Sequence, residues 1–97
     1  MIVVRDIFQV KFGRMKEVLE LGRLMQKSFA GAPERRPRML TDLTGQYYTF
    51  IMEGTFKDLA DFEKSMRQEM PGMSELYHKS FAPLIDSGRR EIFTIVE

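Results

Sequence analysis

The chain has 97 residues, its 15 basic and 14 acidic side chains leave a formal net charge of +1, and it contains no cysteine. A chain of this length forms one core, so we expect a single domain over residues 1–97. The balanced charge predicts no nucleic-acid partner, because phosphate binding shows as a basic face. The apolar runs are too short for a membrane span or a signal-peptide core, and without cysteine there is no disulfide and no thiolate metal site. A cytoplasmic location is the simplest expectation.

The hydrophobic pattern changes period several times along the chain. Alternation of apolar and polar residues with period two predicts strands, and apolar residues at i, i+3, i+4 and i+7 predict helices. We expect strands at Met1–Lys11, in the two arms of Leu40–Gly54 around Gly45, and at Glu91–Glu97, with helices at Arg14–Phe29 and, broken at Pro71-Gly72, at Lys57–Ile85.

Three positions mark expected boundaries of these segments. Thr55 is the expected N-cap of the second helical segment, because its hydroxyl can accept a backbone N–H bond of the first turn. Pro83 is expected to bend or shorten the end of that segment, and Ser87-Gly88 to release the chain into the last strand. The order β-α-β-β-α-β predicts a ferredoxin-like α+β fold, with a four-stranded antiparallel sheet and both helices on one face.

The face of this sheet that carries no helix is expected to be too apolar for water. A sheet covered on one side alternates apolar and polar residues, but these strands place apolar side chains on both sides. In the third strand Tyr48, Phe50 and Met52 oppose Tyr47, Thr49 and Ile51. Because a large exposed apolar face marks an interface, we expect a homodimer formed through the helix-free face.

Both ends of the chain resemble one protein family. Met1–Phe8 and the helix opening at Lys11–Arg14, together with Phe81–Ile85 and Ser87–Ile92, are similar to the NIPSNAP-like proteins of the dimeric α+β barrel superfamily, which also holds antibiotic-biosynthesis monooxygenases and haem-degrading relatives. The resemblance implies that two sheets form a barrel with the helices outside, and that a pocket lies between helices and sheet in each subunit. The matching motifs are structural rather than catalytic, so they imply a fold and leave the activity open.

The only histidine is His78, which lies next to the apolar stripe of the helix that begins near Ser74. It is a candidate general acid or base and a candidate ligand-binding residue, because imidazole titrates near neutral pH. The alternative is a boundary histidine with one nitrogen in water. The haem-degrading relatives resemble this chain in carrying a helical histidine, but they also rely on asparagine and tryptophan, and this sequence contains neither. With one histidine and no ligand-spaced carboxylates, we expect no metal and no cofactor.

Four further residues are candidates for a ligand pocket. Asp6 is an acid inside a strand, which is disfavoured, so it either faces a pocket or bonds a nearby backbone, threonine or arginine. The same two interpretations apply to Asp42, and Thr44 and Arg5 are the candidate partners of these two acids. Gly22 either lets a strand approach the first helix closely or leaves room for a ligand. Tyr48 can orient a ligand or belong to the core, and Met66 offers a flexible thioether to an apolar pocket.

The chain carries one dense basic cluster and no established catalytic motif. Arg35, Arg36 and Arg38 either hold an anion or form a solvated loop. No glycine-rich phosphate loop, nucleophile elbow or HExxH-type helix is present.

These observations leave three functions open. The leading hypothesis is a homodimeric domain that binds a small apolar or aromatic molecule between its helices and its sheet. The enzyme alternative is a cofactor-independent monooxygenase or isomerase that uses His78. The third is an assembly module without a ligand.

Overall fold

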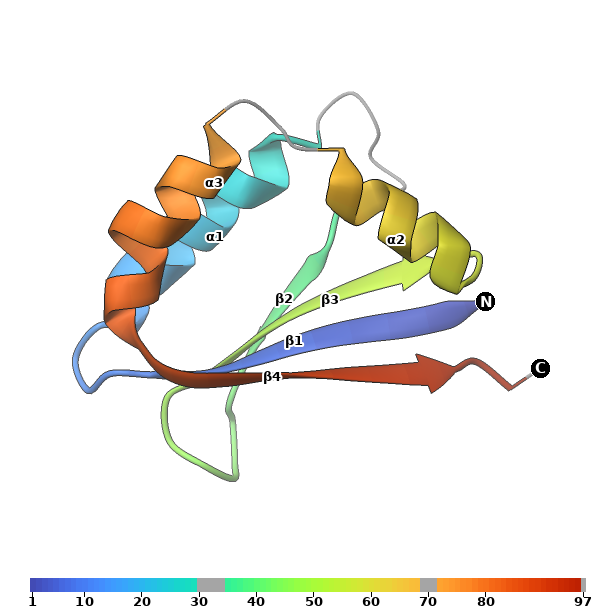
Figure 1. Cartoon of the computed structure of the whole chain (residues 1–97). Coiled ribbons are helices and arrows are strands. Elements are labelled where there is room, and N and C mark those ends of the chain that lie inside the picture. Colours follow the sequence, from blue (N-terminus) through green and yellow to red (C-terminus); the bar gives the residue numbers. More distant parts are fainter. Residues whose placement is uncertain (30–34, 69–71, 97) are drawn as a thin grey trace.

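Four antiparallel strands form one sheet in the computed structural model, which describes residues 1–29, 35–68 and 72–96. The strand order is β2-β3-β1-β4, and the helices all lie on one face of the sheet (Figure 1). The predicted ferredoxin-like α+β fold is thereby confirmed. Within the described ranges no helix is long and apolar enough to cross a membrane. The strands are β1 Ile2–Val10, β2 Arg38–Thr41, β3 Thr49–Phe56 and β4 Ile85–Thr94, and the helices are α1 Met15–Lys27, α2 Leu59–Arg67 and α3 Met73–Leu76.

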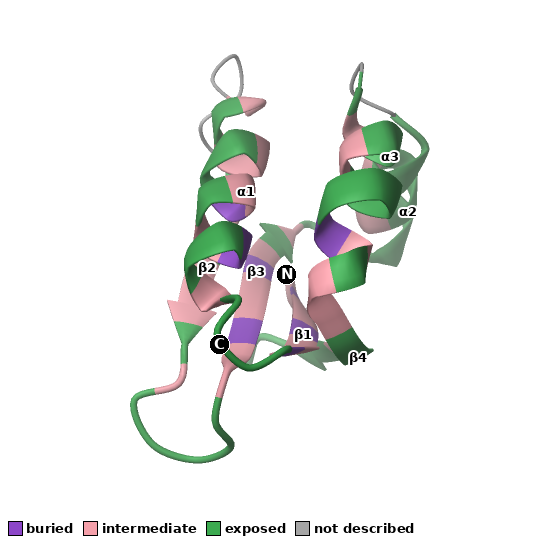
Figure 2. Cartoon of the chain, turned by 90° about the vertical axis from the view of Figure 1, so that its left-hand side faces the viewer, coloured by how far each residue is buried: buried purple, intermediate pink, exposed green. Residues whose placement is uncertain are grey.

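The core lies at one end of the sheet, beneath α1 and the turns that follow α3. Its members Val10, Val18, Phe50 and Phe81 are each at most 1% exposed. On the helix side of β1, Phe8 meets Phe81 edge to face, with 5.0 Å between the ring centroids. Figure 2 shows the buried positions on the inner sides of these helices and on the central strands. Helix α2 has no buried residue, so the helix layer is closely packed only at the core end.

Helix α3 continues into two irregular turns before β4. Tyr77–Phe81 forms a π turn, in which the N–H of Ala82 bonds to the carbonyl of Tyr77, and Ala82–Leu84 forms a 3₁₀ turn. Pro83 has no N–H to donate, and its ring would clash with a carbonyl one α-helical turn earlier. The predicted shortening at Pro83 is therefore seen as two irregular turns in place of a continued α-helix.

The predicted start of the last strand is wrong. Strand β4 begins at Ile85 rather than Glu91, so Ser87 and Gly88 lie inside it. A Cβ at Gly88 would stand 3.0 Å from Cδ1 of Phe8, on the neighbouring strand. The glycine therefore marks a close approach of a ring to a strand backbone rather than a turn.

Two other predicted boundaries are also wrong. The N-cap of α2 is Asp58, whose Oδ1 accepts a bond of 2.8 Å from the N–H of Asp61, whereas Thr55 belongs to β3. Because β3 begins at Thr49, Tyr47 and Tyr48 lie in the β2–β3 loop and not on opposite faces of a strand. The predicted hinge Gly45 does lie in this loop, with a φ of 101°.

The helix-free face is more polar than the sequence suggested. The strand register places Arg38, Glu53, Arg5 and Glu91 side by side across it, and we call these four residues the charged row. Apolar residues such as Ile7 and Ile51 occupy the adjacent row of the same face. The expected last strand began only at Glu91, and the expected central strands began at Leu40, beyond Arg38, so this charged row inside the sheet was not anticipated.

Candidate functional site

A second row of residues crosses the opposite face of the sheet, beneath the helices. Met39 pairs with Met52, Met52 with Asp6, and Asp6 with Arg90, so that each of the four strands contributes one residue. We call these four residues the floor row. Three of the expected pocket residues lie on this side of the sheet. Asp6 belongs to the row, Gly22 lies on α1 above Met39, and Met66 lies on α2.

The floor row is closed at the α1 end. A Cβ built on Gly22 would stand 2.5 Å from Sδ of Met39 and 3.0 Å from Cζ of Phe50, which is fully buried. The space above this glycine is therefore filled by the protein's own side chains. Gly22 allows α1 to approach the sheet closely, which is the packing role that the sequence left open.

The floor row is open at the α2 end. Nε of Arg90 donates to Oδ1 of Asp6 at 2.6 Å, and these two side chains are 41% and 29% exposed. The guanidinium of Arg90 also lies over the ring of Phe62 on α2, 5.0 Å from its centroid. On either side of Phe62 along α2, Leu59 and Met66 remain 61% and 55% exposed. The apolar side of α2 is thus incompletely covered where it stands above the ion pair.

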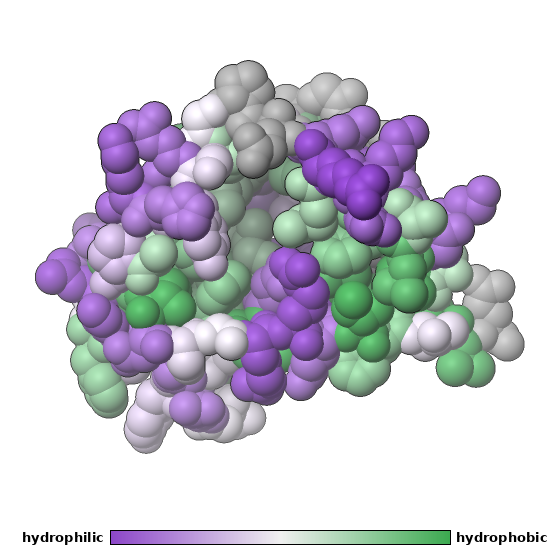
Figure 3. Space-filling view, in the orientation of Figure 1, coloured by the Kyte–Doolittle hydropathy of each residue, from purple (hydrophilic) through white to green (hydrophobic). Residues whose placement is uncertain are grey.

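The space-filling view shows the surface drawn inward between the helical arm of α1 and α3 and the arm of α2 (Figure 3). On this side of the sheet the floor row and α2 supply thioethers, the ring of Phe62 and one carboxylate–guanidinium pair. Such a surface suits an apolar or aromatic molecule that carries one polar group, since ligand sites combine apolar walls with a few fixed polar atoms.

Two expected site residues lie elsewhere. Tyr48 is in the β2–β3 loop with a φ of 59°, and its ring meets Phe12 edge to face at 4.8 Å. With Met15 and Tyr47 it borders a surface hollow of about 410 Å³ at the core end of the sheet. His78 is exposed on the π turn, where its ring meets the adjacent Tyr77 at 5.3 Å.

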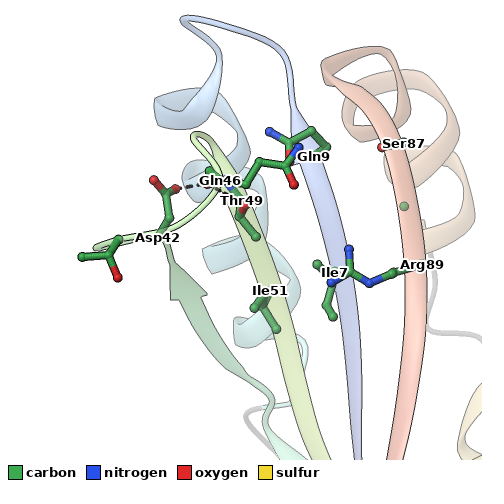
Figure 4. Close-up of a pocket in the computed structure, with 10 residues that line it drawn as sticks. Ile7, Gln9, Asp42, Gln46, Thr49, Ile51, Ser87 and Arg89 are labelled. Atoms are coloured by element: carbon green, nitrogen blue, oxygen red, sulfur yellow. Dashed lines mark hydrogen bonds between the residues drawn. The ribbon is translucent and has the colours of Figure 1, made fainter.

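A further hollow of about 410 Å³ lies on the helix-free face (Figure 4). Ile7 and Ile51 contribute apolar surface, and Arg89 stands on the side away from Asp42. Oδ1 of Asp42 accepts a bond of 2.9 Å from the backbone N–H of Thr49. Asp42 therefore has a backbone partner, as one interpretation of the sequence expected, while Asp6 has Arg90 and neither Thr44 nor Arg5.

Two of the three clustered arginines are held by carboxylates. Arg35 bonds Asp61 at 2.9 Å, and Arg38 bonds Glu53, which also accepts a bond of 2.7 Å from Arg5. The hydrogen bond from Arg5, reinforced by Arg38, holds the pKa of Glu53 below its ordinary value. The N–H of Lys57, followed by Arg35, lowers the pKa of Asp61. Among the described residues no group of three or more His, Cys, Asp or Glu could hold a metal ion.

The residues of the candidate site that the sequence did not single out are Arg90, Phe62, Met39 and Met52. Asp6 and Arg90 are separated by 84 positions in the chain and meet only because β1 and β4 are antiparallel neighbours. Had the predicted last strand begun before Arg90 instead of at Glu91, antiparallel pairing with the first strand could have placed Arg90 opposite Asp6. Residues 85–94 show no regular alternation of charged and apolar residues, so the sequence carried no clear signal for a strand that includes Arg90.

The sheet, its helices and the strand order define a ferredoxin-like α+β domain. No protein-family model and no curated protein sequence matches the chain. Among solved structures, an uncharacterized NIPSNAP domain protein from Burkholderia xenovorans superposes with a TM-score of 0.84 at 12% identity, covering 99% of this chain and 95% of the other.

Two other similar structures extend the comparison. A protein from Nitrosomonas europaea, provisionally assigned as an antibiotic biosynthesis monooxygenase, has a TM-score of 0.78 at 15% identity and covers 100% of both chains. A variant of MhuD, with two manganese protoporphyrin IX molecules bound per active site, has a TM-score of 0.76 at 13% identity, covering 100% of this chain and 96% of the other. The resemblance to NIPSNAP proteins that the sequence indicated is confirmed at the level of the fold.

Proposed function

We propose that this chain is a homodimeric, small-molecule-binding domain, and that an apolar or aromatic ligand with one polar group binds between α2 and the floor row. The observation that carries the proposal is the Asp6–Arg90 pair, which lies part-exposed among methionine and aromatic side chains beneath a helix without buried residues. An ion pair in such surroundings can exchange hydrogen bonds with a ligand at little cost, because both side chains already contact solvent.

One related structure supports a ligand site in a protein of this fold without defining the ligand of this chain. The MhuD structure shows that a protein of this fold holds planar aromatic molecules in an active site. Haem itself is not part of the proposal for this chain. Its only histidine is exposed on the π turn and outside the floor row, so the row offers no axial imidazole.

A second copy of the chain is the proposed partner of the helix-free face. In the single chain Phe93 and Ile95 are 46% and 40% exposed. Burying their apolar surface in a dimer would stabilise it by about 25 cal/mol per Å², before the entropy cost of association is subtracted. We also propose a cytoplasmic location. The cytoplasm is reducing and disfavours disulfides, and this chain has no cysteine to form one.

Titration with 2-naphthol and with 2-naphthoate, followed by calorimetry, tests the ligand site. Both probes combine an aromatic ring with one polar group, and at least one should bind with a dissociation constant in the micromolar to millimolar range, about −4 to −8 kcal/mol. Phe62→Ala should weaken that binding, because it removes the ring under Arg90. Phe12→Ala, at an aromatic residue that is 79% exposed at the other end of the sheet, is the matched control and should bind as the parent does. Equal losses in both variants, or no binding of either probe, would remove the proposal.

A catalytic role for His78 is a second candidate, and the π turn is the observation that favours it. π turns are rare and occur frequently at functional sites, and here the turn Tyr77–Phe81 contains the only histidine. His78→Ala separates the two functions. A binding domain should keep its affinity for 2-naphthol, whereas a cofactor-independent monooxygenase should lose most of its oxygen uptake with phenols and hydroquinones.

A further inference from the structure

The charged row on the helix-free face alternates in sign from one edge of the sheet to the other. In strand order its members are Arg38, Glu53, Arg5 and Glu91, so that their formal charges sum to zero. Glu53 is only 8% exposed although no helix covers this face, because the side chains of Arg5 and Arg38 close over it. Arg5 also lies over the ring of Phe93, 5.3 Å from its centroid.

The two ends of the charged row lie on the edge strands of the sheet, and both reach solvent. Arg38 is 71% exposed and has five N–H donors, of which one contacts Glu53. Glu91 is 37% exposed and accepts a bond of 3.2 Å from Arg89. An arginine at one edge and a glutamate at the other thus retain capacity for an opposite charge.

A two-fold axis that runs parallel to the strands would reverse the row in the facing copy. Arg38 would then oppose the partner's Glu91, and Arg5 would oppose the partner's Glu53, so that all four oppositions pair unlike charges. In the adjacent row the same axis would place Ile7 against the partner's Ile51. An axis along the row would instead set every charge against its own copy, and like charges in contact cost several kcal/mol.

We propose that the charged row fixes the orientation of the dimer, with a second copy of the chain docked on the helix-free face about a two-fold axis parallel to the strands. This inference rests on the proposed dimer and adds to it the residues that select one way of docking. The row excludes the competing orientation by repulsion, which is how interfaces gain specificity beyond their contact area.

Paired charge reversals at the ends of the row test this arrangement by sedimentation equilibrium at low salt. Glu91→Lys would set a lysine against the partner's Arg38, and Arg38→Glu would set two glutamates together. Each variant alone should raise the dissociation constant of the dimer at least about tenfold, since two like-charge contacts form per dimer. A 1:1 mixture should recover the parent affinity, because both ends then pair unlike charges. Glu75→Lys and Lys79→Glu, a surface pair on the helix side, make the same charge changes as controls and should leave the affinity unchanged.

The outcomes distinguish the orientation from the dimer itself. If the parent chain is monomeric, the proposed dimer fails. If the parent dimerises and either variant alone matches it, or the mixture stays as weak as its components, the dimer stands and the orientation is overturned. Recovery in the mixture also shows that both variants fold.

Cross-linking tests the same geometry without adding charge, because the chain has no cysteine of its own. Facing sheets lie about 10 Å apart, within reach of a short bis-maleimide. A mixture of Arg38→Cys and Glu91→Cys should give a cross-linked dimer, whereas each variant alone should give none. Cross-linking of Arg38→Cys to itself would indicate the axis along the row and would refute the proposal, as would the absence of any cross-link in the mixture.

Discussion

Replacing Gly22 by alanine tests how closely α1 is packed on the sheet. On an exposed helix this change stabilises by about 1 kcal/mol, because alanine restricts the unfolded chain and favours the helix. Here the new Cβ would meet Sδ of Met39 at 2.5 Å and Cζ of Phe50 at 3.0 Å. Overpacking of this kind costs about 1–3 kcal/mol. Met39 has a flexible side chain that can give way, whereas the ring of Phe50 is fully buried, so we expect a net loss of about 1 kcal/mol.

Urea and thermal unfolding at one protein concentration measure this loss, since a dimer adds a concentration-dependent term. The melting temperature should fall by about 4–8 °C. Arg23→Ala, at the next and exposed helix position, is the control and should stay within about 0.5 kcal/mol of the parent. In a Met39→Ala background the cost of Gly22→Ala should shrink or change sign, because the thioether is gone. If Gly22→Ala stabilises the parent chain by the full helix-propensity gain, α1 does not contact the sheet as described.

Three further changes have defined outcomes. Glu53→Gln should lower the free energy of unfolding at pH 7 by about 1–3 kcal/mol and flatten its acid dependence. The fold holds the pKa of Glu53 below 4.5, so this stabilisation is complete above the unfolded pKa and disappears as the pH falls through the folded pKa. Urea midpoints from neutral to acid pH measure this, and parallel curves for parent and variant would contradict it. Asp58→Ala should cost about 1 kcal/mol by removing the N-cap of α2, whereas Thr55→Ala should cost no more than about 0.5 kcal/mol; equal costs in thermal melts would mean that Asp58 is not the cap. Asp6→Asn should cost no more than about 1 kcal/mol, because its ion pair with Arg90 is part-exposed, and it should change the relative affinities for 2-naphthol and 2-naphthoate; an unchanged ratio in calorimetry would place the ligand elsewhere.

The element order of the fold was predictable because periodicity alone reports which residues face a core. The alternation in Met1–Lys11 and the helical stripe in Arg14–Phe29 both mark elements that the structure contains. The start of β4 was not predictable from the same signal. Gly88 resembles a turn residue in the sequence, and only the ring of Phe8 on the neighbouring strand shows why a glycine stands inside a strand.

The candidate site was less predictable than the fold, because its contacts join residues that are far apart in the chain. Asp6 is recognisable as an unusual strand acid, but its partner depends on the exact register of β1 and β4. The charged row was hidden for a similar reason. Arg5, Glu53 and Glu91 are unremarkable charged residues in the sequence when each is taken alone, and they form a pattern only once the strand order β2-β3-β1-β4 is known.

Methionine-methyl NMR gives the most direct test of the claim that a ligand lies on the floor row beneath α2. The chain is labelled at its methionine methyl groups and titrated with 2-naphthol, and each signal is assigned by single Met→Leu replacements. We predict saturable shifts of the Met52 and Met66 methyls, with Met1, 55% exposed at the start of the chain, unaffected. Shifts confined to Met15, beside Tyr48 at the core end, or no saturable shift at all, would contradict the account.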